Sequence, residues 1–247
     1  MKSLLRLTAV QMKLYLREPM ASFFTLIYPT MLLLILGFIW GNEPNPGFGG
    51  LGFVDSMLPA YLGLVLVTVG LMGLPIATAE DREKGVLRRF HSTPLSPAVY
   101  LFSNVFVYYL MSLAGVTLLF LTGKLAYNAS FEGNIFSVLA AFTLSALSIF
   151  SFGYMIASLA PTARTAQVIG MVFAFLMMFL GGAVFPLEVL PEKVINICKF
   201  IPLYHVVILI KGLWHGGSWS DYWLNIIVII GVLIVGVGIS VKTFRWE

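Results

Sequence analysis

A charged run from residue 80 to 91 holds the densest group of ionisable side chains in this sequence. Glu80 and Lys84 are four residues apart, in the favoured order for an ion pair along a helix. Val86 and Phe90 would share one face of that helix. The chemistry that this pattern offers is binding, by a short amphipathic helix whose apolar side chains contact a surface other than lipid. The alternative is a charged loop that only fixes the membrane topology.

Gly85 lies in the middle of this segment. A glycine inside a helix is less favourable than alanine by about 1 kcal/mol. Its presence therefore predicts either a bend or a close approach of another backbone. Pro94 and Pro97 end the segment.

No group of residues predicts catalysis. His91, His205 and His215 lie in separate segments without metal-ligand spacing, and Cys198 is the single cysteine. The sequence has no glycine-rich loop of the type that holds nucleotide phosphates. The apolar segments contain almost no ionisable residues, which disfavours intramembrane catalysis and ion-driven transport. We therefore predict that the chain is not an enzyme and binds no cofactor itself.

Long apolar blocks must position the charged segment. Of the 247 residues, 59% are apolar and 11% are charged, whereas an ordinary soluble domain has about 25% charged residues. A helix needs roughly 20 apolar residues to cross a bilayer. The blocks predict an all-α integral membrane protein with six spans, at about 20–40, 57–79, 98–123, 134–160, 166–185 and 222–241.

The segment 186–214 is ambiguous, because residues 194–214 are apolar enough to suggest a seventh span. Pro202 interrupts them, and three basic side chains lie among them. With six spans, one side of the membrane holds 11 of the 15 Lys and Arg residues, so the positive-inside rule places both termini in the cytoplasm. We therefore interpret 186–214 as a broken, re-entrant helical element on the outer side, packed against protein.

The N-terminal segment 2–17 predicts a helix lying in the membrane interface, with a basic wedge and an apolar opposite side. The basic residues are Lys2, Arg6, Lys13 and Arg17, and the apolar ones are Leu4, Leu7, Leu14 and Tyr15. The alternative is a poorly ordered basic tail.

Several motifs, in this order along the chain, resemble ABC-2 type export permeases. They are Leu-Arg-Glu-Pro at 16–19, Glu-Asp-Arg-Glu-Lys-Gly-Val-Leu-Arg-Arg at 80–89 with Thr-Pro-Leu-Ser-Pro at 93–97, Gly-Ala-Val-Phe-Pro-Leu-Glu-Val-Leu-Pro at 182–191 with Ile-Pro-Leu-Tyr at 201–204, and Phe-Arg-Trp-Glu at 244–247. The resemblance covers essentially the whole chain, 1–247, as a single transmembrane domain. It implies the transmembrane subunit of a multidrug- or antibiotic-efflux-like ABC exporter.

The resemblance also implies partners. Such permeases pair as homodimers or similar heterodimers in the cytoplasmic membrane, here of a prokaryote, and bind two cytosolic ATPase subunits that hold ATP and Mg²⁺. Nucleic acid is not an expected partner. Residues 80–92 would be the coupling helix that docks on the ATPase, through Glu80, Asp81, Arg82, Glu83, Lys84, Gly85, Val86, Leu87 and Phe90.

The resemblance assigns two further groups of residues. The broken element would form an extracellular gate, at Phe185, Pro186, Glu188, Pro191, Pro202 and Tyr204. Spans two and five would line a central path in the dimer, at Thr68, Met72, Phe175, Met178 and Phe179. Flexible methionine and aromatic surfaces suit amphipathic or hydrophobic cargo such as a drug, antibiotic, peptide or lipid. The alternatives are export of a lipid-linked glycan, or a passive scaffold or channel subunit that is not coupled to ATP.

Overall fold

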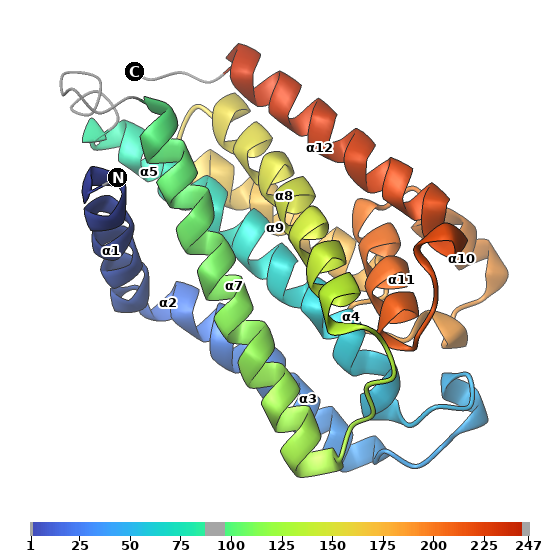
Figure 1. Cartoon of the computed structure of the whole chain (residues 1–247). Coiled ribbons are helices and arrows are strands. Elements are labelled where there is room, and N and C mark those ends of the chain that lie inside the picture. Colours follow the sequence, from blue (N-terminus) through green and yellow to red (C-terminus); the bar gives the residue numbers. More distant parts are fainter. Residues whose placement is uncertain (1, 87–96, 244–247) are drawn as a thin grey trace.

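The computed structural model describes residues 2–86 and 97–243, and within these ranges every regular element is a helix (Figure 1). The first half of the chain forms α1 Lys2–Arg17, α2 Pro19–Ser22, η1 Phe23–Ile27, α3 Tyr28–Trp40, η2 Pro46–Phe48, α4 Phe53–Val67, η3 Thr68–Gly73, α5 Leu74–Glu83 and α7 Pro97–Tyr127. The second half forms α8 Ile135–Leu159, α9 Ala163–Leu180, η4 Leu187–Val189, α10 Glu192–Cys198, α11 Pro202–Trp214, η5 Trp219–Tyr222 and α12 Trp223–Thr243. The predicted all-α class is confirmed.

Six helical stretches are long and apolar enough to cross a membrane, as predicted. They are Pro19–Trp40, Pro46–Glu83, Val99–Tyr127, Ile135–Leu159, Ala163–Leu180 and Trp219–Thr243. Local signals set their ends. Asn134 caps α8 by accepting hydrogen bonds from two backbone N–H groups, and Thr162 caps α9 in the same way. Span five ends at Leu180, five residues earlier than predicted, and the chain then turns through Gly182 at φ +78°.

The ambiguous segment forms two helices, α10 and α11, that are bent by 103° at the break before Pro202. They are therefore not one straight crossing, and the predicted re-entrant element is confirmed. Proline fits the first turn of α11, where its missing N–H leaves no intrahelical bond unmade. At its other end α11 meets the loop after α7, because Trp214 Nε1–H donates to the carbonyl of Ser130 at 3.0 Å.

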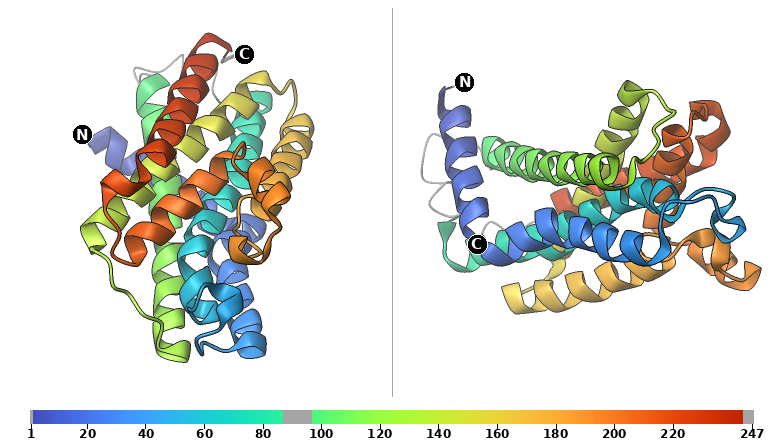
Figure 2. Two further views of the ribbon diagram at one scale, coloured as in Figure 1. Left: turned by 90° about the vertical axis from the view of Figure 1, so that its right-hand side faces the viewer. Right: turned by 90° about the horizontal axis from the view of Figure 1, so that it is seen from below.

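Helix α1 lies across one end of the bundle, nearly perpendicular to α3 and α7 (Figure 2). Tyr15 fixes it there. This side chain is buried, stands edge-on to Tyr108 of α7 at 5.4 Å between ring centroids, and its hydroxyl lies 2.6 Å from that of Thr25. The sequence pattern placed Tyr15 on the apolar side of an interfacial helix, but it packs against protein. Leu14, from the same predicted side, is exposed.

We call the end that holds α1 the basic end. Several described basic residues lie in, or directly after, the helices that begin or end there: Lys13, Arg17, Arg82, Lys84, Arg164 and Lys242. Figure 1 shows α1, the last turns of α5 and α12 and the first turn of α7 at this end. Described basic residues at or near the other end are Lys124, Lys193, Lys199 and Lys211.

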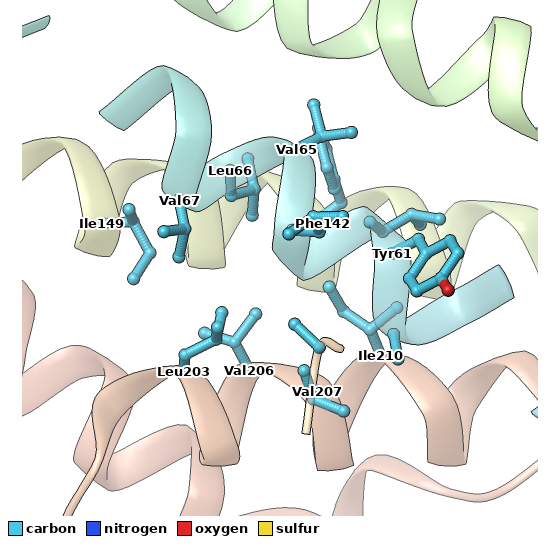
Figure 3. Close-up of a cluster of buried hydrophobic side chains, with 14 of the residues drawn as sticks. Tyr61, Val65, Leu66, Val67, Phe142, Ile149, Leu203, Val206, Val207 and Ile210 are labelled. Atoms are coloured by element: carbon cyan, nitrogen blue, oxygen red, sulfur yellow. The ribbon is translucent and has the colours of Figure 1, made fainter. Parts of the chain in front are cut away.

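Span two is the centre of the bundle. In its most apolar stretch, 78% of the residues are buried within the chain, against 22% in span one and 17% in span six. Figure 3 shows why: Val65, Leu66 and Val67 of α4 lie between Phe142 and Ile149 of α8 on one side and α11 on the other. Any movement of span two must therefore move its neighbours.

Two π-helical turns interrupt spans one and two, and each ends two residues before a proline. Pro29 and Pro75 have no N–H, so the carbonyls four residues earlier, those of Thr25 and Leu71, receive no helical hydrogen bond from them. The helix widens at each point, as π-bulges do.

Glycines of neighbouring helices lie against the carbonyls at these turns. A Cβ atom on Gly115 of α7 would lie 2.6 Å from the Thr25 oxygen, and one on Gly170 of α9 would lie 2.2 Å from the Leu71 oxygen. A Cβ atom on Gly153 of α8 would lie 2.0 Å from the Gly70 oxygen. Only glycine allows backbones this close, where Cα–H groups can meet the carbonyl oxygens.

Candidate functional site

The last turn of α5 ends span two and carries the acidic and basic residues predicted to bind a partner. The Arg82 guanidinium donates to the carbonyl of Ala157 at 3.0 Å and to that of Ala160. These are free carbonyls at the C-terminal end of α8, where the helix dipole favours a cation. Arg82 therefore ties the end of span two to the end of span four.

Glu83, the next residue, binds the following helix. Its carboxylate accepts a hydrogen bond at 2.9 Å from the backbone N–H of Ala163, the first residue of α9. The first N–H groups of a helix have no partner within it, and its dipole favours an anion there. Adjacent residues of opposite charge thus hold the two helix ends that flank the turn at 160–162.

Asp81 makes the third connection, to α7. Its carboxylate accepts a hydrogen bond from the Tyr100 hydroxyl, and the Nδ2 group of Asn104 donates to the same hydroxyl at 3.3 Å. Tyr100 is buried. Three consecutive side chains of α5 therefore join span two to spans three, four and five. We call Asp81, Arg82 and Glu83 the clasp.

The remaining charged pair faces outward. Lys84 Nζ lies 2.6 Å from the Glu80 carboxylate, as predicted from their spacing, and the side chains are exposed. The hydrogen bond that Lys84 donates to the Glu80 carboxylate raises the pKa of the Lys84 ammonium. An exposed pair of this kind stabilises the helix little.

The chain turns directly after the clasp. Helix α5 ends at Glu83, and Gly85 adopts φ +67°, which glycine tolerates better than any other residue. The predicted bend is present, and a Cβ atom on Gly85 would meet no described residue within 4 Å, so the structure shows no close backbone approach among the described residues. The predicted 80–92 helix is thus divided at 84–85. Leu87 and Phe90 lie outside the described residues.

At the opposite end, Glu188 of the predicted gate has a charged partner. Lys211 of α11 donates to the Glu188 carboxylate and, at 2.8 Å, to the Ser56 hydroxyl of α4. Ser56 is fully buried. This contact joins the segment before α10 to the re-entrant helix and to the first turn of span two.

The other predicted gate residues occupy the same region with less specific contacts. Phe185 is exposed, with its ring centroid 6.0 Å from that of Phe179. Pro186 and Pro191 precede η4 and α10, and Pro202 begins α11. Tyr204 is partly buried, with its ring edge-on to that of His205.

The predicted path residues differ in their exposure within the single chain. Thr68 is buried and donates to the carbonyl of Val65 in its own helix. Met72 is partly buried and Met178 is buried, whereas Phe175 and Phe179 are exposed on α9.

Sequence reasoning missed the roles of Tyr100, Ser56 and Lys211. Tyr100 lies in a predicted span, where a hydroxyl usually bonds its own helix. Ser56 precedes the predicted start of span two, and Lys211 contributed only to the charge balance between the two sides. No sequence signal pairs Lys211 with a residue 155 positions away. Among the described residues, no three His, Cys, Asp or Glu side chains are grouped to hold a metal ion.

The sequence also matches known proteins. Residues 43–242 match a family model described as ABC-2 family transporter protein. The chain is similar to the probable multidrug ABC transporter permease YbhR of Escherichia coli (strain K12), with 23% identity over 193 residues, which are 76% of this chain and 51% of the relative. It is similar to the putative transport permease YvfS of Bacillus subtilis (strain 168), with 27% identity over 171 residues, which are 67% of this chain and 66% of the relative.

A more distant similarity is to ABC transporter G family member 20 of Dictyostelium discoideum, with 22% identity over 208 residues, which are 82% of this chain and 27% of the relative. The chain spans about half the length of the Escherichia coli relatives that it matches.

Proposed function

Because the chain belongs to the ABC-2 family of transporter proteins, we propose that it is the membrane permease of an exporter driven by ATP hydrolysis on separate ATPase chains. The basic end would face the cytoplasm, in accord with its excess of Lys and Arg. Two permease chains would pair, and the loop after span two would dock on the ATPase.

The clasp is the observation that carries this proposal. A loop that only fixed topology would need charges but no connections to other spans. Here the three charges before the loop bind α7, the end of α8 and the start of α9. A displacement of the loop by an ATPase would therefore be transmitted to spans two to five together. Loops become mechanical links when rigid elements meet at them.

The cargo would be an amphipathic or hydrophobic molecule. The name of the similar YbhR protein, a probable multidrug permease, supports this class. The exposed aromatic side chains of α9 offer the kind of adaptable apolar surface that such cargo needs.

The proposal is tested by co-expression with an ATPase encoded beside this chain, followed by co-purification and by transport of an amphipathic dye into inside-out vesicles. We expect ATP-dependent uptake that an ATPase lacking its catalytic glutamate abolishes. Reporters fused after Thr243 should be cytoplasmic. Failure to bind any such ATPase, or dye movement that ignores ATP, would instead favour the passive scaffold or channel.

A further inference from the structure

A polar pocket of about 170 Å³ lies at the basic end, lined by residues of α1, α5 and α7 and by Glu18. Its polar lining consists of Gln11, Glu18, Glu80, Asp81, Asn104 and Tyr108. Three of these six residues carry carboxylates, and no basic residue lines the pocket. Lys84 forms its ion pair with Glu80 and its charge also acts on Asp81 and Glu18, but neither of these two carboxylates forms an ion pair with a described basic residue. The pocket is therefore electronegative.

Two buried side chains in the pocket have hydrogen-bonding atoms without partners. Tyr108 is 6% exposed and its hydroxyl makes no hydrogen bond to a described residue. Asn104 is 7% exposed, and its Nδ2 group is bound to Tyr100 while its Oδ1 atom accepts nothing from the described chain. Neither the Tyr108 hydroxyl nor the Asn104 Oδ1 atom is among the described unpaired atoms that are sealed from solvent. Both atoms are therefore accessible from the pocket that their side chains line. The two side chains are more than nine-tenths buried, but these atoms remain accessible from the pocket, so each has room for a donor that the described chain does not supply.

The chemistry of the missing donor follows from the lining. Carboxylates, an amide oxygen and a hydroxyl all accept hydrogen bonds from an ammonium group, which has donors and a positive charge. The aromatic rings of Tyr15 and Tyr108 can also attract a cation. Leu14 and Val107 add an apolar wall for the carbon atoms next to the charge.

We propose that this pocket binds the ammonium head group of an amphipathic molecule at the membrane interface. Helix α1 lies across the end of the bundle (Figure 2), and we expect this end to lie at the membrane interface, where amphipathic molecules place their polar heads. The pocket volume accommodates a head group and leaves the tail in lipid. Asp81 belongs to both the pocket and the clasp, so a bound ammonium group would contact the end of span two. The head group could belong to phosphatidylethanolamine or to a free alkylammonium compound.

The test uses the purified full chain in phosphatidylcholine nanodiscs, without ATP or a partner, so its result is independent of the exporter proposal. The probe is dodecylammonium with a nitroxide at its tail, and its immobilised spectrum reports binding. We expect Glu18→Gln to weaken binding about tenfold, the loss of one charge-assisted contact. Tyr108→Phe should weaken it less, and the matched control Glu192→Gln, an exposed carboxylate of α10, should have no effect.

Two results would overturn the site: unchanged binding in both Glu18→Gln and Tyr108→Phe, or equal binding of the nitroxide carboxylate of the same length. Because Glu18 is exposed and Tyr108→Phe removes only a hydroxyl, both variants should fold. Nanodiscs with phosphatidylethanolamine identify the source. Competition by this lipid assigns the site to its head group, and unchanged binding in its presence assigns the site to a free alkylammonium.

Discussion

The Arg82 guanidinium donates a hydrogen bond to the carbonyl of Ala157, 3.0 Å away, across 75 positions of sequence. One residue at the end of span two thereby caps the helix of span four. Since Glu83 binds the start of the next helix, the turn between spans four and five is held from a single point.

Arg82→Ala should destabilise the protein by about 2 kcal/mol, because the carbonyls of Ala157 and Ala160 lose a charged donor. The measurement is thermal unfolding in mild detergent. Arg164→Ala is the matched control: it removes the same charge at the same end from an exposed side chain of α9, and we expect little change. Equal losses in both variants would mean that net charge, and not the clasp, is what matters.

Gly153→Ala should destabilise the packing of α8 on span two by about 1–3 kcal/mol, because the new Cβ would lie 2.0 Å from the Gly70 oxygen and force the helices apart. Gly231→Ala in α12 is the control, since a Cβ there meets nothing within 4 Å. Alanine should be neutral or slightly stabilising at that position. The melting temperatures of Gly153→Ala and Gly231→Ala are compared with that of wild type. Similar melting temperatures for the two variants would refute the close approach of Gly153 to the Gly70 carbonyl.

Spans one and six were predicted to within three residues, because an apolar block of bilayer length and its flanking polar residues define a span directly. The re-entrant element followed from Pro202 and from the charge balance. The π-helical turns before Pro29 and Pro75 did not follow, since a proline in a span predicts a kink but not its form.

The partners of the clasp were not predictable either. The spacing of Glu80 and Lys84 predicts their ion pair because both lie on one helix. Arg82 and Glu83 bind backbone atoms about 75 to 80 positions away, and backbone groups carry no sequence signature. The sequence therefore indicated that this segment binds something, and the structure identifies contacts within the chain itself.

Lys211→Met should destabilise the end opposite the basic end by about 1–3 kcal/mol, because Glu188 loses its cation and the buried Ser56 hydroxyl loses a donor. Glu188→Gln alone should be milder, since its side chain is about one-third exposed. In a double-mutant cycle the two losses should not add, because the residues are partners. Additive melting-temperature shifts would show that the pair contributes no coupling.

Acid should weaken the end opposite the basic end through His215. Burial, aided by the nearby Lys211 ammonium, lowers the pKa of His215 in the folded protein. The unfolded state therefore takes up a proton first as the pH falls below about 6.5, and stability is lost there. Between about pH 7.5 and 5.5 the melting temperature should fall in wild type, and fall less in His215→Gln. If the melting temperatures of wild type and His215→Gln fall in parallel with pH, His215 is not a source of the acid sensitivity.

The docking surface of the proposed coupling segment begins at Val86, the last described residue before the loop. Placing a carboxylate there should prevent docking, because burying an unpaired charge at an interface costs several kcal/mol. Lys84→Ala should have little effect, since rim charges contribute little each. Both positions follow the end of α5, so the membrane yield of both variants should match wild type.

Co-purification of the ATPase with Val86→Asp, measured beside wild type and Lys84→Ala at equal membrane yield, tests the coupling role most directly. We predict that the ATPase is lost from Val86→Asp together with ATP-driven transport, and retained by Lys84→Ala. Wild-type levels of bound ATPase and transport in Val86→Asp would contradict the account and leave the segment as a determinant of topology.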